Sequence, residues 1–211
     1  MKNDDLIKSA HQHLLKNDKV LSRIIKKNSN CNLHPRRQYF QALLTNIIGQ
    51  QLSVQSASAI IARFYNHFGK NVSTSQIVNA PNETLRSLGL SNAKAKYVKR
   101  LAESIENKTI SLKNIRKKTN SEIEAELTQV KGIGIWTVHM FLIFTLGRHD
   151  VLPFSDLGIK KAIMLNYGLL NMPSEVEVKE LAGKMKWSPY ESIASWYLWK
   201  SLEYIATNFE N

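Results

Sequence analysis

The sequence predicts an all-α protein, and three observations support that fold class. Apolar residues recur at three- and four-residue steps through most of the chain, the period of a helix buried on one face. No run of alternating polar and β-branched residues stands between turn signals, so no sheet is expected. The composition is 43% apolar, which is ample for a packed core. A chain of 211 residues can form one or two domains.

The first two helices expected from this pattern lie in residues 36–49 and 53–69. The second is capped by Ser53 and ends at Gly69, a residue type that often stops helices. The apolar face of the first comprises Phe40, Leu43, Leu44, Ile47 and Ile48. That of the second comprises Val54, Ala57, Ile60, Ile61, Phe64 and Phe68.

Further helices are expected to give about ten in all, mostly joined by short connections. The helix in residues 91–107 begins with a Ser91 or Asn92 cap. The other expected helical segments are residues 82–89, 121–130, 136–147, 156–168, 174–185 and 188–209. The segment "NKTISLKNIRKK", about residues 107–118, is basic and poor in large apolar residues, so it is expected to be a connector. If the chain has two lobes, this segment is the predicted break between them.

Charge and cysteine content narrow the classes of function. The net charge is +12 and the pI about 9.8, which favour a polyanionic partner, nucleic acid before an anionic membrane. Cys31 is the only cysteine, which excludes an intrachain disulfide, a four-cysteine iron–sulfur cluster and a cysteine-rich zinc site. No HExxH pattern is present, and no apolar run approaches the roughly 18 residues of a membrane span. We therefore expect an intracellular protein without a signal peptide and without a membrane partner.

The stretch "LTQVKGIGIWTV", residues 127–138, joins two apolar helices through a turn with two glycines. Gly132 and Gly134 allow a sharp turn and close approach of another backbone. Amides at the start of the second helix form an anion site, and Lys131 adds a cation at its rim. A plain corner between helices would use glycine for the same conformational reason. The stretch by itself does not separate these interpretations.

The pattern L-x-x-V-K-G-I-G-x-W-T resembles the hairpin of the helix-hairpin-helix (HhH-GPD) DNA glycosylases, here at about residues 123–146. In that family the hairpin amides hold a DNA phosphate, often with a monovalent cation, K⁺ or Na⁺, on loop carbonyls. Two positions depart from the family pattern, because Lys131 replaces a usual proline and Val138 a usual small residue. The resemblance implies phosphate contacts at Lys131, Gly132, Gly134, Trp136 and Thr137. It implies cation ligands at the carbonyls of Thr128, Val130 and Ile133. No other cofactor is expected.

Asp156 follows the hairpin and stands at the start of a helix, in "LPFSDLGIKK". An isolated aspartate there is usually an ordinary N-cap. The segment, however, resembles the one that carries the essential aspartate of these glycosylases. Cleavage of an N-glycosidic bond builds positive charge on the sugar, which a fixed carboxylate stabilises. Asp156 is therefore the candidate catalytic residue.

Trp136 occupies the position of the catalytic lysine in glycosylases that also cleave the strand, two residues after the second hairpin glycine. Tryptophan cannot form a Schiff base. Those enzymes often carry a C-terminal iron–sulfur cluster, which one cysteine cannot build. The resemblance therefore implies a monofunctional enzyme without lyase activity.

Two further segments resemble the alkylpurine glycosylases of the DNA-3-methyladenine glycosylase II type. "NIIGQQLSVQSA", residues 46–57, matches the segment with the intercalating residue, so Gln51 or Leu52 is the candidate wedge. A core role for Leu52 is an equal alternative. "WSPYES", residues 187–192, resembles W-x-P-[WY]-R-S, with Glu191 in place of the arginine. The match implies a base pocket formed by Trp136, Tyr190 and Trp187.

Together these segments predict one HhH-GPD catalytic unit over residues 1–211, with two helical lobes and without the family's N-terminal β domain. The expected activity is excision of alkylated purines, such as 3-methyladenine and 7-methylguanine, from damaged double-stranded DNA. The expected form is a monomer, in the cytoplasm (nucleoid) of a prokaryote or the nucleus of a eukaryote. Two alternatives remain: the same fold acting on a deaminated or mismatched base, and a non-catalytic protein that binds damaged DNA.

Overall fold

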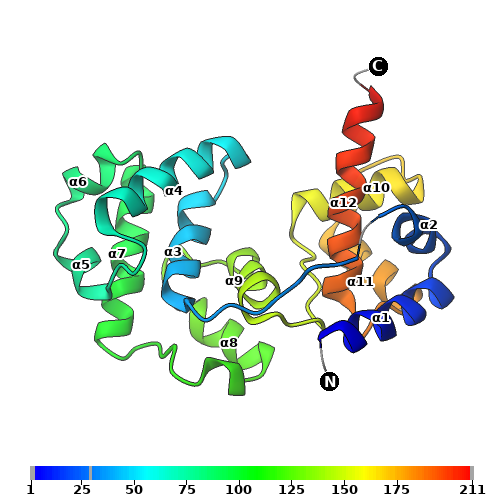
Figure 1. Cartoon of the computed structure of the whole chain (residues 1–211), viewed down its shortest axis with the longest axis horizontal. Coiled ribbons are helices and arrows are strands. Elements are labelled where there is room, and N and C mark those ends of the chain that lie inside the picture. The colour runs from blue at the N-terminus through cyan, green and yellow to red at the C-terminus, as the bar shows by residue number, and fades with distance from the viewer. Residues whose placement is uncertain (1–2, 29, 210–211) are drawn as a thin grey trace. The chain divides into compact units, whose positions relative to one another are not determined.

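A computed structural model describes residues 3–28 and 30–209, and these form helices without any strand. Twelve α-helices occur in the described residues, with a 3₁₀-helix η1 (Ile115–Lys117) and a π-helix η2 (Leu142–Leu146) (Figure 1). The all-α prediction is confirmed. The predicted number of about ten helices was low, because the two helices that precede residue 36 and the short helix Thr74–Asn79 were not expected from the sequence pattern.

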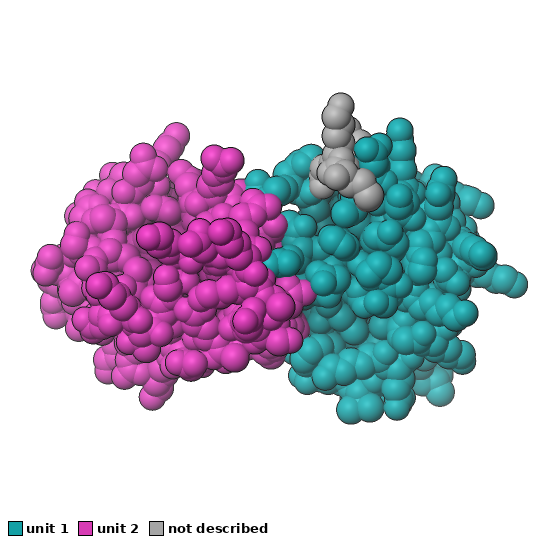
Figure 2. All heavy atoms as spheres, turned by 90° about the horizontal axis from the view of Figure 1, so that it is seen from below, with its two compact units in different colours: residues 1–35, 147–211 teal, residues 36–146 magenta. Residues whose placement is uncertain are grey.

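The chain divides into two compact units, coloured separately in Figure 2. Unit 1 comprises residues 1–35 and 147–211, and unit 2 comprises residues 36–146. The predicted break at residues 107–118 is therefore wrong, because that segment lies inside unit 2. Its small and basic composition reflects a surface loop rather than a boundary.

Unit 2 is built around α3, which packs against α4, α7 and α9. Its helices are α3 (Tyr39–Gly49), α4 (Val54–Phe68), α5 (Thr74–Asn79), α6 (Asn82–Ser87), α7 (Asn92–Glu106), α8 (Asn120–Leu127) and α9 (Ile135–Phe141). All five predicted face residues of α3 are buried, since they repeat with the helical period. On α4 only Phe64 is fully buried. Val54 is 85% exposed, so its assignment to the core was wrong.

Local capping explains where several of these helices begin and end. The side chains of Ser53 and Ser91 accept the amides of Ser56 and Lys94, which are otherwise unpaired in the first turn. Gly69 closes α4 with a positive φ of 83°. The predicted boundaries of α4 and α7 are confirmed because these signals lie in the local sequence.

Unit 1 packs α12 against α2 and α10, and α1 against α2. Its helices are α1 (Asn3–Asn17), α2 (Lys19–Lys27), α10 (Leu157–Tyr167), α11 (Glu175–Lys184) and α12 (Glu191–Phe209). Buried Asp18 ties three of its segments together. Its Oδ1 accepts the amides of Val20 and Leu21, and its Oδ2 accepts the Tyr167 hydroxyl and, at 2.8 Å, the Trp187 indole. Burial, followed by the hydrogen bond and charge of Asp18, raises the pKa of Tyr167.

A second polar contact joins α1 to α12. The Tyr197 hydroxyl lies 2.7 Å from His11 Nε2 and accepts the backbone amide of Cys31. Burial raises the pKa of Tyr197 to about 12 and that of the Cys31 thiol to about 11. Burial also lowers the pKa of His11 from its ordinary 6.5.

The lowered pKa of His11 predicts a loss of stability in mild acid. The neutral ring is favoured in the folded protein, so this contribution is complete above pH 6.5 and is lost as pH falls through the folded-state pKa. We expect the melting temperature of the wild type to fall more between about pH 7.5 and about pH 5 than that of His11→Gln. Thermal melts of both proteins at the two pH values measure this difference. Equal losses in the two proteins would contradict the assignment.

Candidate active site and DNA interface

The glycine turn of unit 2 forms a helical hairpin, with α8 before it and α9 after it. Gly132 has a φ of 105°, and a Cβ atom there would lie 2.2 Å from Cγ of Tyr97 on α7. Glycine is therefore required at this position by both backbone and packing. Gly134 is the N-cap of α9 with an ordinary φ of −91°, and a Cβ atom there would have no neighbour within 4 Å. Neither the backbone conformation nor the internal packing requires glycine at position 134. The open space beside it is therefore available to a group outside the protein.

The first turn of α9 supplies the amides that the resemblance assigned to phosphate binding. Amides of a first helical turn have no acceptor within the helix. Lys131 is exposed beside them. Thr137, however, is buried, and its hydroxyl accepts a hydrogen bond from Gln50 Nε2 at 2.9 Å. Only the backbone amide of Thr137 can therefore bind a phosphate. Its side chain holds Gln50 instead.

The turn between α3 and α4 is fixed to the hairpin by Gln50 and Lys94. Gln50 Nε2 donates to the carbonyl of Gly132 and to Thr137 Oγ1, each at 2.9 Å. Lys94 Nζ donates to the carbonyls of Ile48 and Gln50 at 2.8 and 2.7 Å, which places a cation at the C-terminal end of α3. Burial lowers the pKa of Lys94. These contacts hold the following residues, Gln51 and Leu52, at a defined place beside the hairpin.

Gln51 and Leu52 both lie at the surface. Gln51 is exposed and has a positive φ of 54°, an uncommon conformation for a residue other than glycine. Leu52 is 37% exposed and is followed closely by the exposed Val54. The alternative that Leu52 belongs to the core is therefore wrong. An apolar side chain and an amide on an exposed turn suit insertion into a base stack, and the choice between them stays open.

Asp156 in unit 1 is 9% exposed and is the N-cap of α10. Its Oδ1 accepts the amide of Ile159 at 2.8 Å and the indole N–H of Trp199 at 2.9 Å. Gly158 leaves room for this pair, since a Cβ there would lie 3.0 Å from Asp156 Oδ1 and 3.2 Å from Trp199 Nε1. The carboxylate is thus held in one orientation by a helix N-terminus and an aromatic donor from α12.

Trp199 is a positioning residue that no pattern in the sequence singles out. The motif around Asp156 gives no signal for a donor 43 positions later, and an aromatic stripe on a helix usually means core. Trp199→Phe keeps an aromatic ring but removes the N–H donor to Asp156. If Asp156 is the catalytic carboxylate, we expect the single-turnover rate of base release to fall by roughly tenfold, because the carboxylate is held less firmly in one orientation. The affinity for abasic duplex should change little, whereas the melting temperature should fall, because the lost hydrogen bond is present in the resting protein. A rate equal to the wild type would show that the contact does not matter for the reaction.

Tyr190 is half-buried and directly precedes α12 in unit 1. Its ring lies edge-on to His13 at 5.3 Å between centroids, and 6.1 Å from His149. It is therefore partly accessible, as a stacking residue must be. Glu191 follows it, and its Oε2 atom is buried without a hydrogen-bond partner. Nothing in the structure explains why a glutamate stands at this position.

The assignment of Trp187 to the base pocket is wrong. The indole is fully buried, and its N–H donates to Asp18. No face of the ring is left for a base to stack on. Trp136, the remaining pocket candidate, lies in the first turn of α9 and is partly exposed.

Within each unit, a residue that the sequence did not single out contacts the predicted ones. In unit 2, Gln50 joins the turn that carries Gln51 and Leu52 to the hairpin. In unit 1, Asp156 meets Trp199. No helix in the described residues is long and apolar enough to cross a membrane. No group of three or more His, Cys, Asp or Glu residues in that part of the chain could hold a metal ion.

Comparison with known proteins identifies the family. The model of the HhH-GPD superfamily base excision DNA repair proteins matches residues 44–187. The chain is 34% identical to the alkylbase DNA glycosidase-like protein mag2 of Schizosaccharomyces pombe, over 95% of this chain and 96% of that protein. It is 32% identical to DNA-3-methyladenine glycosylase 1 of the same organism, over 91% of this chain and 86% of the relative.

Solved structures agree with the sequence relatives. S. pombe 3-methyladenine DNA glycosylase in complex with abasic DNA superposes with a TM-score of 0.85 and 30% identity, covering 92% of this chain and 97% of that one. A DNA-3-methyladenine glycosidase from Bacillus halodurans gives a TM-score of 0.79 and 31% identity, over 94% and 91% of the two chains. With the family model covering more than half of its length, this chain belongs to the HhH-GPD superfamily of base excision DNA repair proteins.

Proposed function

We propose that this protein is a monofunctional DNA glycosylase that removes alkylated purines, such as 3-methyladenine and 7-methylguanine, from duplex DNA. The observation that carries the proposal is the fixed Asp156 carboxylate, held by the α10 N-terminus and by Trp199, in a chain of this family. The names of the relatives support the choice of alkylated purines.

The reaction requires little from the enzyme beyond a carboxylate held near the sugar and a water molecule positioned to attack C1′. As the bond from sugar C1′ to the purine nitrogen breaks, its electron pair leaves with the base and positive charge builds on the sugar. Asp156 stabilises that charge. Water then adds to C1′ and loses its proton to the carboxylate or to solvent. A cationic alkylated purine departs as a neutral base, so no strong general acid is required.

Three features of the described residues support DNA binding. The hairpin presents the first-turn amides of α9, the exposed Lys131 and the open space at Gly134. The turn carrying Gln51 and Leu52 would fill the gap left by the flipped base. Tyr190 in unit 1 and Trp136 in unit 2 each stay a candidate for stacking on a base, and stacking contributes about 1–3 kcal/mol per base in single-strand binders.

The absence of lyase activity is part of the proposal and follows from Trp136. A lyase needs an amine to attack C1′, and an indole cannot form the required imine. The test incubates the protein with lesion-containing duplex and borohydride, beside alkali-treated samples. We expect strand cleavage only after alkali and no covalent protein–DNA adduct. A borohydride-trapped adduct would contradict the monofunctional assignment.

A panel of damaged duplexes tests the lesion class. It comprises 7-methylguanine, 3-methyladenine, hypoxanthine, uracil and mismatched bases, each with equal flanking sequence. Release of the alkylated purines well above the others supports the proposal. Preferential release of hypoxanthine or uracil would move the activity to deaminated bases. Binding without any release would make the protein a non-catalytic damage binder.

A monovalent cation at the hairpin is a further part of the proposal. The carbonyls of Thr128, Val130 and Ile133 lie in the turn between α8 and α9, and that of Val130 also accepts the Ile133 amide at 2.9 Å. A carbonyl has two lone pairs, so this bond leaves one for a cation. Binding of abasic duplex in K⁺ should be tighter than in tetramethylammonium at equal ionic strength. Equal affinities in the two salts would contradict a cation site.

A further inference from the structure

Positive charge is concentrated in unit 2, and within it in one loop. Unit 2 holds 15 of the 29 Lys and Arg residues but only 6 of the 17 Asp and Glu residues. Residues 107–118, here called the basic loop, contain five of these cations and no acid. The hairpin contributes only Lys131. The function described above does not use the basic loop.

The basic loop is folded against unit 2 by apolar anchors. Ile110 and Ile115 are buried, and the Ile110 amide donates to the carbonyl of Ser104 at 3.1 Å. Lys108 and Asn114 adopt positive φ angles of 58° and 56°, which shape the turns on either side. The loop therefore has a defined conformation, with its isoleucines inside.

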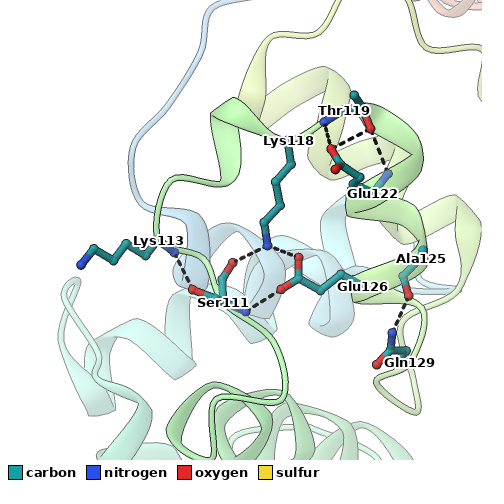
Figure 3. A network of polar contacts seen from close by, with 8 residues as sticks. All are labelled: Ser111, Lys113, Lys118, Thr119, Glu122, Ala125, Glu126 and Gln129. Carbon is teal, nitrogen blue, oxygen red and sulfur yellow. Dashed lines mark hydrogen bonds and ion pairs between the residues drawn. The ribbon is translucent and has the colours of Figure 1, made fainter.

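Glu126 fastens the basic loop to α8, the first helix of the hairpin, as Figure 3 shows. Its Oε1 accepts the Ser111 amide at 2.7 Å, and its Oε2 pairs with Lys118 Nζ. Lys118 also reaches the Ser111 carbonyl at 3.5 Å. One acid and one lysine are thus used to hold the loop in place, and the loop and the hairpin share α8 as a common support.

The other cationic side chains of the basic loop are exposed to solvent. Lys108, Lys113, Arg116 and Lys117 are all exposed. In Figure 3 the Lys113 side chain extends away from Glu126 and from the rest of the network. Solubility alone would explain scattered lysines, but it does not require a rigid support for them. A cluster of cations at fixed positions matches a phosphate backbone, whose charges are also at fixed spacing.

We propose that the basic loop is a second DNA-backbone contact, which binds phosphates of the duplex flanking the lesion. This inference rests on the proposed function, because it extends the DNA surface of the same enzyme. Glu126 lies in the last turn of α8, directly before the hairpin turn, so the loop and the hairpin are supported at the same end of one helix. The loop supplies affinity for flanking DNA and plays no part in the chemistry.

The experiment compares the wild type with Lys113→Ala/Lys117→Ala on duplexes carrying an abasic site. Affinity is measured against salt concentration on a duplex of about 25 base pairs and on one of about 11. We expect the double variant to bind the long duplex about tenfold more weakly, with a salt slope smaller by about 1.8, or 0.9 for each lost phosphate contact. The difference should be smaller on the short duplex, which offers fewer flanking phosphates. An unchanged slope on the long duplex overturns the proposal.

A matched control removes two exposed lysines elsewhere, Lys19→Ala/Lys26→Ala on α2, and should leave the slope unchanged. Equal loss with this control would mean that net charge, not the loop, governs affinity. Glu126→Ala separates the same two explanations in another way. It keeps every cation and raises the net charge by one, so a net-charge effect tightens binding, whereas loss of the loop's support weakens it.

Base release distinguishes failure of this inference from failure of the proposed function. With enzyme in saturating excess, the Lys113→Ala/Lys117→Ala variant should release an alkylated purine at the wild-type rate. If the wild type releases alkylated purine but the double variant binds long duplex normally, only the loop assignment fails. If the wild type releases none, the proposed function fails, while the salt slopes still decide whether the loop binds DNA.

Discussion

Asp156→Asn is expected to lower the rate of base release by about a hundred- to a thousandfold or more, while leaving the fold and DNA binding intact. The fixed negative charge is lost just where the sugar becomes positive, and losses of this order follow removal of single electrostatic contacts to a transition state. The asparagine Oδ1 can still accept the Ile159 amide and the Trp199 indole, so the cap of α10 is preserved.

Single-turnover release of 7-methylguanine measures this loss, with abasic-duplex affinity and melting temperature measured beside it. Asp150→Asn provides a matched control, since it removes an exposed carboxylate six residues upstream and should retain the wild-type rate. If Asp156→Asn keeps more than about a tenth of the wild-type rate, Asp156 is not the residue that stabilises the sugar.

Gly132→Ala is expected to destabilise the protein by about 2–6 kcal/mol. A non-glycine residue at a strained positive φ costs about 1–3 kcal/mol, and forcing extra atoms into a packed site costs a similar amount. Here the new Cβ would lie 2.2 Å from the Tyr97 ring at a φ of 105°. Denaturant unfolding of the variant should show a lower midpoint. A midpoint equal to that of the wild type would mean that the turn differs from the one described.

Gly134→Ala is the matched partner of this variant and separates folding from binding. Its φ is ordinary and its Cβ would occupy open space, so stability should fall by about 1 kcal/mol or less, the usual cost of an alanine N-cap. The methyl group would stand where a phosphate is expected to approach the α9 amides. Abasic-duplex affinity should therefore fall about tenfold or more, a loss of about 1.4 kcal/mol or more. Unchanged affinity would mean that the hairpin does not bind the backbone.

Much of the fold could be predicted because its signals are local. The five buried residues of α3 repeat with the helical period, and Ser53, Ser91 and Asp156 cap the helices that follow them. Each of these features depends on neighbours within four residues in the sequence. The boundary between the units could not be read in the same way. It depends on which helices pack together, and the segment that looked most like a linker is an ordered loop of unit 2.

The contacts that complete the candidate site were missed because they join distant segments. Trp199 binds Asp156 across 43 positions, and Gln50 binds Gly132 across 82. Neither partner has a local motif, although a pair of glutamines ending an apolar helix is a signal that could have drawn attention to Gln50. Trp187 was misassigned for the converse reason. A motif can predict that an aromatic residue lies near a site. The burial of Trp187 against Asp18, however, depends on tertiary packing that the motif does not contain.

The release of free bases by the wild-type protein from duplex DNA treated with a methylating agent tests the proposed function most directly. Chromatography of the released bases identifies each product. We expect free 3-methyladenine and 7-methylguanine, with abasic sites left in strands that stay intact until alkali is added. Tight binding of abasic duplex without release of either base would contradict the proposed function.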